Sequence, residues 1–257
     1  CFVRGTPIPQ LWCWPNSMAE LTGEAKQRYV AGLFAGIAGR YDLMNTLMTG
    51  GRHLAWKETT ARLASQGLTG PALDVATGTG DLALALARRP GIDRAVGLDL
   101  LPQMVEQARG KAATKGLAEK TDITVGDAMM LPFPDDSFVC VTSGFSLRNM
   151  PDLTGALAEM ARVAQPGGRI AILELTPMKG GPWAALFRFY FHRAVPLMGR
   201  LVAGNASAYT YLPRSVDYFP DADTLAGMLS GRGLIDVGYR RMGLGAVCLH
   251  WGIKPPR

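Results

Sequence analysis

Apolar and polar positions along the middle of the chain follow a pattern typical of short strands that alternate with helices. Short apolar runs bounded by Gly, Pro and Asp predict the strands, and segments with apolar residues three or four positions apart predict the helices. Strands are expected at 72–76, 94–100, 123–125, 138–142 and 169–175, with helices at 80–89, 102–115 and 152–164. This alternation predicts an α/β fold, in which a parallel sheet carries helices on both faces.

The segments before and after this core also show strand-like and helix-like spacing of apolar residues. Two final strands, 234–241 and 244–251, are joined by the turn Gly243–Gly245, which predicts a close antiparallel pair at the edge of the sheet. Further helices are expected at 24–39, 43–49, 52–66, 182–203 and 221–231.

The composition is that of a globular protein. Of the 257 residues, 48% are hydrophobic and 19% are charged, which suits one good-sized α/β domain. We expect this domain to span 24–257, after an N-terminal tail, 1–23, that is disordered or an over-extended start. The net charge of +6 comes without a Lys/Arg run or an RNA-binding signature, so no nucleic-acid partner is expected. The four cysteines lack zinc-site spacing, and no segment is long and apolar enough to span a bilayer.

The first candidate site is the loop after strand 72–76. Gly78 and Gly80 let a ligand approach the backbone closely, and the next helix offers free N–H groups. Gly78-x-Gly80 fits the phosphate loop of dinucleotide enzymes and the loop of S-adenosylmethionine enzymes alike. Asp74 favours the second class, because a carboxylate repels a pyrophosphate and attracts a cationic sulfonium and ammonium. The alternative for Asp74 is a carboxylate that only caps the loop or the helix.

Acidic residues also end the next two strands. Asp99 lies about 20 residues past the glycine loop, where an acid can accept hydrogen bonds from two ribose hydroxyls. Asp127 is placed to accept a hydrogen bond from the exocyclic amine of adenine. The simpler alternatives are a helix cap at Asp99 and a turn aspartate at Asp127. Together, acids at three successive strand ends favour a cationic adenosyl ligand.

Longer stretches of the sequence carry a family resemblance. They are RYDLMNTLMTGGRHLAWK, LDVATGTGD, GLDLLPQM, GDAMMLPFPDDSF, SLRNMPD, ALAEMARVAQPGG, AYTYLPRSVDYFP and GAVCLHWGIK. With these, the chain resembles the UbiE/MenG C-methyltransferases of quinone biosynthesis over nearly all of 24–254. LDVATGTGD is general to class I methyltransferases, whereas RYDLMN, LRN and AYTYLPRSVDYFP are much more specific.

The resemblance implies a Rossmann-like class I methyltransferase fold, with a seven-stranded, mostly parallel sheet whose last strand is antiparallel. It implies methyl transfer from S-adenosylmethionine, without a metal, to a ring carbon of a polyprenyl quinol. Demethylmenaquinol is the expected acceptor, and the equivalent step of ubiquinone biosynthesis is the alternative. The family serine near LRN falls at Gly144, so the neighbouring Ser143 is the expected contact. The family's other cofactor positions fall at Thr79, Asp99, Asp127 and Ala128.

The loop 143–149 would face the transferred methyl group. We expect Arg148 to stabilise the quinolate, since a cation ~4 Å from an oxyanion is worth up to about 4 kcal/mol at an effective dielectric of ~20, or about three pKa units. Because arginine is a poor base, Tyr41 or a water is expected to carry the proton, and Asn149 to orient the quinol or that water. The alternative for Arg148 is a solvated loop residue.

Residues 182–220 are expected to form a substrate-side insertion or lid. The aromatic stretch 183–191 predicts either an apolar wall for the prenyl chain or an ordinary core helix. Peripheral contact with the inner face of the membrane, from the cytoplasm, is expected for an enzyme with a lipid-soluble substrate; a homodimer is compatible with the sequence. The residues placed to meet anionic headgroups are Arg188, His192, Arg193 and Arg200.

Two other function classes fit parts of the sequence. A nicotinamide oxidoreductase would use the same glycine loop, and Asp74 argues against it. A non-catalytic scaffold of quinone biosynthesis would lack the intact quinol-site residues. His53, His192 and His250 show no triad or metal spacing, so they are expected to be structural.

Overall fold

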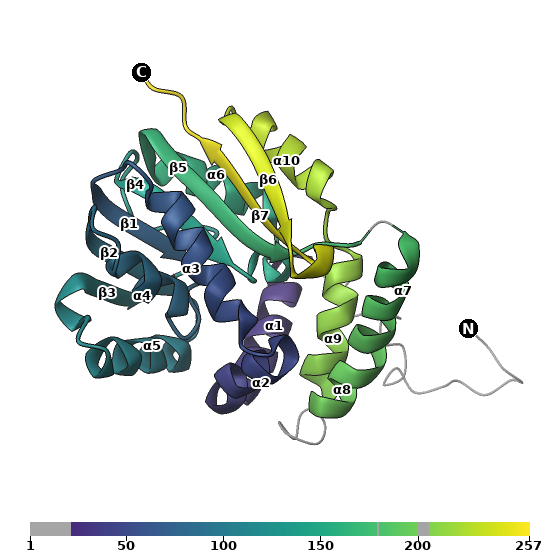
Figure 1. The fold of residues 1–257 in the computed structure, drawn as a ribbon. Coiled ribbons are helices and arrows are strands. Elements are labelled where there is room, and N and C mark those ends of the chain that lie inside the picture. The colour runs from purple at the N-terminus through teal and green to yellow at the C-terminus, as the bar shows by residue number, and fades with distance from the viewer. Residues whose placement is uncertain (1–21, 179, 200–205) are drawn as a thin grey trace, which may run out of the picture.

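The computed structural model describes residues 22–178, 180–199 and 206–257. Within these ranges one sheet has the strand order β3-β2-β1-β4-β5-β7-β6 (Figure 1). Strands β1 to β5 pair in parallel, and β7 is antiparallel to both β5 and β6. The predicted α/β architecture with an antiparallel last strand is confirmed. The strands are β1 (Gly70–Val75), β2 (Ile92–Asp99), β3 (Thr121–Val125), β4 (Phe138–Gly144), β5 (Ala164–Leu175), β6 (Ile235–Met242) and β7 (Val247–Ile253).

The strand order reverses direction next to β1. From β1 the chain builds outward through β2 to β3, and it then returns to place β4 on the other side of β1. Connections on the two sides of such a reversal diverge, which leaves a crevice beyond the carboxyl ends of the strands. The fold therefore places a ligand site beside the ends of β1 and β4.

Helices cover both faces of the sheet, as predicted. α3 (Arg52–Ser65), α4 (Asp81–Ala87) and α5 (Pro102–Thr114) lie on one face, and α6 (Leu153–Val163) and α10 (Ala222–Gly231) on the other. The alternation along β1 explains this. Ala72 packs towards α3 and α4, whereas Leu73 and Val75 pack towards α6 and α10. Full burial of each such large side chain stabilises the fold by about 1.5–3 kcal/mol.

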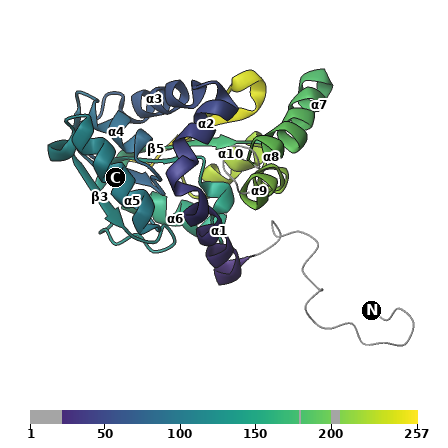
Figure 2. The ribbon, with the colours of Figure 1, turned by 90° about the horizontal axis from the view of Figure 1, so that it is seen from below.

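A third group of helices lies beyond the carboxyl ends of the strands (Figures 1 and 2). Their apolar residues form a separate core, with Met44, Phe191 and Val195 at its centre. The group consists of α1 (Gly23–Ile37), α2 (Tyr41–Thr49), α7 (Gly181–Phe189), a π-helical turn (Tyr190–Ala194), α8 (Val195–Met198) and α9 (Ala206–Asp217). None of the helices in the described ranges is long and apolar enough to cross a bilayer.

This third group differs most from the sequence-based prediction. The single helix expected at 182–203 is instead α7, the π-helical turn and α8, and positions 200–205 lie outside the described residues. No helix was predicted at 206–217, where the structure has α9 with Pro213 inside it. Positions 1–21 of the expected tail also lie outside the described residues.

Candidate active site

A cavity of about 140 Å³ lies beyond the carboxyl ends of β1 to β4. Its walls come from the residues that follow each of these strands and from α1, which crosses above them. The predicted cofactor residues that line it are Asp74, Gly78, Thr79, Asp99, Asp127 and Ala128.

Asp74 is the most deeply buried acid of this cavity, with 1% of its surface exposed. Its carboxylate accepts hydrogen bonds from the hydroxyls of Thr77 (2.6 Å) and Thr142 (2.9 Å). Burial raises the pKa of Asp74 to about 6, and the two hydroxyl groups and Lys57 oppose the rise. The capping alternative is therefore partly right, because Asp74 does hold the loop, but the same carboxylate also faces the cavity.

Asp99 and Asp127 face the cavity from the next two strands. Asp99 accepts hydrogen bonds from the backbone N–H groups of Gly78 (2.8 Å) and Leu101 (2.9 Å), and burial raises its pKa. Asp127 accepts from the backbone of Met129 (2.9 Å) and from Gln27 on α1 (2.7 Å). A carboxylate has about four acceptor positions, so each retains capacity for ligand donors.

Thr79 belongs to a charged cluster beneath the glycine loop. Its hydroxyl donates to Asp42 (2.7 Å) and accepts from Lys111 (2.9 Å). Lys111 also pairs with Asp81 (2.7 Å), which pairs in turn with Lys57 (3.0 Å). Burial alone would raise the pKa of Asp81, but the two lysines hold it well below its usual range. The cluster ties α2, α3 and α5 to the loop.

Gly80 and Ser143 do not line this cavity, contrary to the prediction. Gly80 has φ +84°, and a Cβ there would lie 2.8 Å from the Cβ of Ala108, so its role is the close packing of α4 on α5. Ser143 is buried, with its hydroxyl donating to the carbonyl of Val75 (3.0 Å) and contacting the hydroxyl of Ser146. In its place Gly144 and Ser146 line the cavity.

The cavity fits S-adenosylmethionine better than a pyrophosphate. Three carboxylates surround it, so a cationic ligand is attracted and a dianionic one repelled. At Gly78, φ is +56° and a Cβ would meet only Tyr41 at 3.9 Å, which leaves the backbone open to a ligand. In the described part of the chain, no group of three or more His, Cys, Asp or Glu side chains could hold a metal ion.

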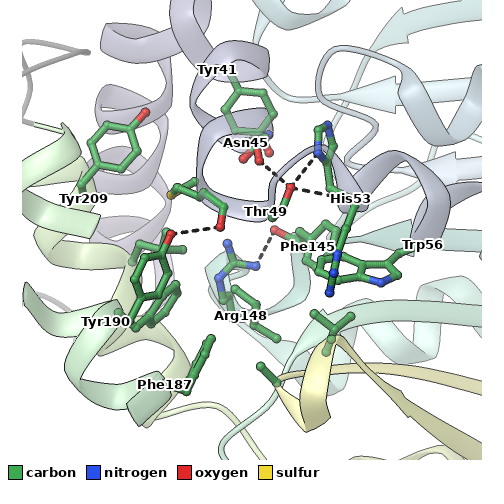
Figure 3. A pocket seen from close by; sticks show the side chains of 18 of the residues that line it. Tyr41, Asn45, Thr49, His53, Trp56, Phe145, Arg148, Phe187, Tyr190 and Tyr209 are labelled. Atoms are coloured by element: carbon green, nitrogen blue, oxygen red, sulfur yellow. Dashed lines mark hydrogen bonds between the residues drawn. The ribbon is translucent and has the colours of Figure 1, made fainter. Parts of the chain in front are cut away.

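A second cavity, of about 440 Å³, adjoins the first. Its walls are mostly apolar and come from α1, α2, α3, the turn Leu147–Asn149, the π-helical turn and α9 (Figure 3). The predicted insertion contributes Phe187, Tyr190, Phe191, Tyr209, Tyr211 and Leu212. The two cavities meet at the residues that line both, which are Phe34, Tyr41, Lys57, Phe145 and Asn149.

Arg148 enters the second cavity as half of a buried ion pair. Its Nη1 lies 2.5 Å from Oε1 of Glu174 and 2.6 Å from the carbonyl oxygen of Phe145. The two charged side chains are 5% and 0% exposed, so Arg148 is not the solvated loop residue of the alternative interpretation. Within the described ranges, Nε of Arg148 and Oδ1 of Asn149 are both buried and have no hydrogen-bond partner.

His53 also lines the second cavity, which the sequence analysis did not predict. Its Nδ1 lies 3.0 Å from the hydroxyl of Thr49, and that hydroxyl donates to the carbonyl of Asn45 at 2.7 Å (Figure 3). A Thr49 hydroxyl that donates to Asn45 can only accept at the contact with His53, which favours the tautomer protonated at Nδ1. Burial, together with the charge of Lys57, lowers the pKa of His53, so the imidazole is neutral at pH 7.

Residues 22–254 match the model of the ubiE/COQ5 methyltransferase family. The chain belongs to this family. It is 44% identical over 229 residues to a demethylmenaquinone methyltransferase of Deinococcus radiodurans, an alignment that covers 89% of the chain and 94% of that protein. It is 41% identical over 231 residues to a ubiquinone/menaquinone biosynthesis C-methyltransferase of Saccharophagus degradans, covering 90% and 93% of the two chains. The methyltransferase assignment leaves a nicotinamide oxidoreductase without support.

Solved structures show the same fold. A SAM-dependent methyltransferase of Thermotoga maritima superposes with a TM-score of 0.62 at 16% identity, covering 88% of this methyltransferase and 99% of that chain. Another SAM-dependent methyltransferase, from Aquifex aeolicus, superposes with a TM-score of 0.58 at 19% identity and covers 83% and 97%. The predicted class I methyltransferase fold is thereby confirmed.

Several site residues of this methyltransferase were missed by the sequence analysis. Glu174 lies at the end of the predicted strand 169–175, where an acid is a detectable signal. Tyr209 and Tyr211 lie inside the family stretch AYTYLPRSVDYFP. Lys57 ends the family stretch RYDLMNTLMTGGRHLAWK, but its place at the junction depends on how α3 lies against the glycine loop.

Proposed function

We propose that this methyltransferase transfers a methyl group from S-adenosylmethionine to a ring carbon of a polyprenyl quinol, with demethylmenaquinol as the acceptor. The observation that carries the proposal is the pair of adjoining cavities, one lined by acids and the other by apolar side chains, that share five residues. A cationic methyl donor and an apolar ring would meet at these shared residues. The names of the relatives given above support the acceptor.

Within this proposal the acids hold and orient the cofactor. Asp99 is the ribose ligand, Asp127 meets the adenine amine, and Asp74 attracts the cationic end of the molecule. When bound, S-adenosylmethionine supplies an electrophilic methyl group on a sulfonium. Tyr41 and Asn149, which line both cavities, border the path of that methyl group. When donor and acceptor are held in one geometry, their translational and rotational entropy is lost on binding and not in the reaction step, which lowers the barrier.

The acceptor must become electron-rich before it can take the methyl group. The hydroxyl beside the acceptor carbon would lose its proton to a water, either directly or through the Tyr41 hydroxyl, which passes its own proton on. The oxygen electrons would then delocalise into the ring. With the cofactor held by Asp74, Asp99 and Asp127, the ring carbon would take the methyl group, and the electrons of the broken bond would stay on sulfur. Loss of the hydrogen on that carbon to water as a proton would restore the aromatic ring, and return of a proton to the oxygen would complete the methylated quinol.

The role of Arg148 is narrower than the sequence suggested. A free guanidinium next to the oxyanion would be worth about three pKa units, but Glu174 lies against Nη1 and offsets much of that charge. What the pair presents to the acceptor is an oriented dipole with the unpartnered Nε–H of Arg148. Arg148 therefore acts as a hydrogen-bond donor to the quinolate, held in place by Glu174.

The prenyl chain would leave the second cavity near α7 and α8, where we place contact with the membrane surface. Both helices expose large apolar side chains: Leu186 is 55%, Phe189 68% and Leu197 57% exposed. Arg188 and Arg193 are exposed beside them and suit anionic headgroups. His192 pairs with Asp217 at 3.3 Å, and Arg200 lies outside the described residues. A homodimer stays a prediction, which the molar mass from light scattering would test.

A panel of reduced acceptors tests the proposed substrate. Under anaerobic conditions the enzyme should methylate demethylmenaquinol faster than the corresponding precursor of ubiquinol. A clear preference for the ubiquinol precursor would move the assignment to the alternative acceptor, for which the relative of Saccharophagus degradans offers support. Transfer to neither would contradict the proposal.

A further inference from the structure

Two tyrosines of α9 line the second cavity and have buried hydroxyl groups. Tyr209 is 3% and Tyr211 5% exposed, and both line the cavity. Neither hydroxyl has a hydrogen-bond partner among the described residues. A buried polar group without a partner costs about 1–3 kcal/mol, so two in one apolar cavity call for an explanation. A ligand in the cavity that carries oxygen atoms is one such explanation.

Packing holds both rings in place before a ligand arrives. Gly199, after α8, lies directly against the ring of Tyr209, and a Cβ at this position would overlap that ring. Tyr211 packs edge-on against Tyr29 of α1, with ring centroids 5.8 Å apart and an interplanar angle of 71°. Figure 3 shows the Tyr209 ring reaching from α9 towards the side of the cavity formed by α2. The two hydroxyls are therefore preorganised donors.

The charges around each tyrosine differ. Apart from burial, Arg148 lowers the pKa of Tyr211, and Tyr29 and Glu174 raise it. Tyr41 raises the pKa of Tyr209. Burial raises the pKa of both phenols to about 12, so both stay protonated at any physiological pH. Tyr211 thus lies within electrostatic reach of Arg148, whose Nε–H is also buried without a partner. Two unpartnered donors in one apolar wall have the make-up of an oxyanion hole.

We propose that Tyr211 and the Nε–H of Arg148 together donate to the quinol oxygen beside the acceptor carbon, and that Tyr209 binds the second quinol oxygen. The inference rests on the proposed function, because it assigns the oxygens of a quinol. Tyr211 then stabilises the charge that develops on the first oxygen, so loss of its hydroxyl should lower kcat. Tyr209 binds the oxygen that stays protonated, so loss of its hydroxyl should raise KM for the acceptor.

The role of Tyr211 can be tested without methyl transfer, by measuring the ionisation of a bound naphthol whose absorbance changes when it loses its proton. 4-Nitro-1-naphthol absorbs differently as naphthol and as naphtholate, so its titration can be followed while it is bound to the full-length protein with S-adenosylhomocysteine. Tyr211→Phe should lower the ionisation constant of the bound probe about ten-fold or more, the size expected for one hydrogen bond to a charged oxygen. Tyr239→Phe is the matched control, because its hydroxyl donates to Asp223 (2.6 Å) outside both cavities. The control should titrate the probe like the wild type.

Steady-state rates complete the test. Tyr211→Phe should reduce kcat about ten- to a hundred-fold, and Tyr209→Phe should raise KM for the quinol about five-fold with little change in kcat. Neither should weaken S-adenosylmethionine binding or lower the melting temperature, since neither hydroxyl has a partner to lose. An ionisation constant in Tyr211→Phe equal to that of the wild type would overturn the inference while the proposed function stands. Absence of any quinol methylation by the wild type would overturn both.

Discussion

Arg148, on the turn after β4, lies 2.5 Å from Glu174, near the end of β5, and both side chains are buried. The parallel register of β4 and β5, which pairs Gly144 with Leu173, brings the two residues together. Two buried charges offset each other only as a pair, so loss of either partner leaves an uncompensated charge in the interior. The pair is thus a single structural unit with one end in the acceptor cavity.

Arg148→Met should abolish most turnover and also destabilise the protein by about 3–5 kcal/mol, the usual cost of breaking a buried pair. The double variant Arg148→Met/Glu174→Leu should recover most of the free energy of unfolding and none of the turnover. Urea unfolding and quinol methylation measure the two effects separately. Near-normal turnover in either variant would remove Arg148 from the reaction.

The raised pKa of Asp74 makes stability depend on pH. Folding raises this pKa from 3.8 to about 6, so the folded state binds the proton more tightly than the unfolded state does. The ligand-free protein should therefore lose stability as the pH rises from about 4 to about 6, and the cost, on the order of 3 kcal/mol, remains in full above pH 6. Unfolding curves from pH 4 to pH 8 measure it.

Asp74→Asn should remove that pH-dependent loss and bind S-adenosylmethionine more weakly at pH 7.5. Ionised Asp74 attracts the cationic ligand, so the affinity of the wild type should rise through pH 6, and that of the variant should rise less. Asp122→Asn is a control, since Asp122 is exposed and pairs only with exposed Arg94. Equal affinities of wild type and Asp74→Asn in calorimetry would show that Asp74 only holds the loop.

The two glycines of the loop should respond differently to substitution. Gly80→Ala brings a Cβ against Ala108 at a φ of +84°, so the melting temperature should fall while the remaining folded protein binds S-adenosylmethionine normally. Gly78→Ala places its methyl group towards the cavity, so binding should weaken as well. Thermal unfolding and calorimetry below the melting temperature separate the two outcomes. Equal losses of affinity would return Gly80 to the cofactor site.

Membrane contact through α7 predicts that Phe189→Glu reduces sedimentation with anionic liposomes by several-fold. A glutamate there removes an exposed apolar side chain and adds a charge that anionic headgroups repel. Ile235→Glu makes the same kind of change on β6, away from α7, and should sediment like the wild type. If the wild type itself stays in solution with liposomes of every anionic content, α7 has no membrane role.

The sequence was most informative where local pattern decides structure. The strands β1 to β5 and their parallel arrangement follow from apolar runs and crossover helices, and the acids at the ends of β1, β2 and β3 all reach one cavity. Each of these positions is fixed by its own strand. Asp74, Asp99 and Asp127 could therefore be found without knowledge of any partner.

What the sequence could not provide depends on residues far apart in the chain. The pairing of Arg148 with Glu174 requires the register of two strands, and it changes the expected electrostatics of the site. The proton position on His53 is set by Thr49 and Asn45, a chain of contacts that no spacing rule encodes. At Gly80, a motif position also serves the packing of two helices, which the motif alone does not indicate.

Transfer of a ¹³C-labelled methyl group from S-adenosylmethionine to demethylmenaquinol, followed by NMR under anaerobic conditions, tests the central claim most directly. We predict one labelled methyl per acceptor, bonded to a ring carbon, and no transfer to the oxidised quinone, which has no phenolic proton to lose. Label on oxygen, equal transfer to the oxidised quinone, or no transfer to the quinol would contradict the account.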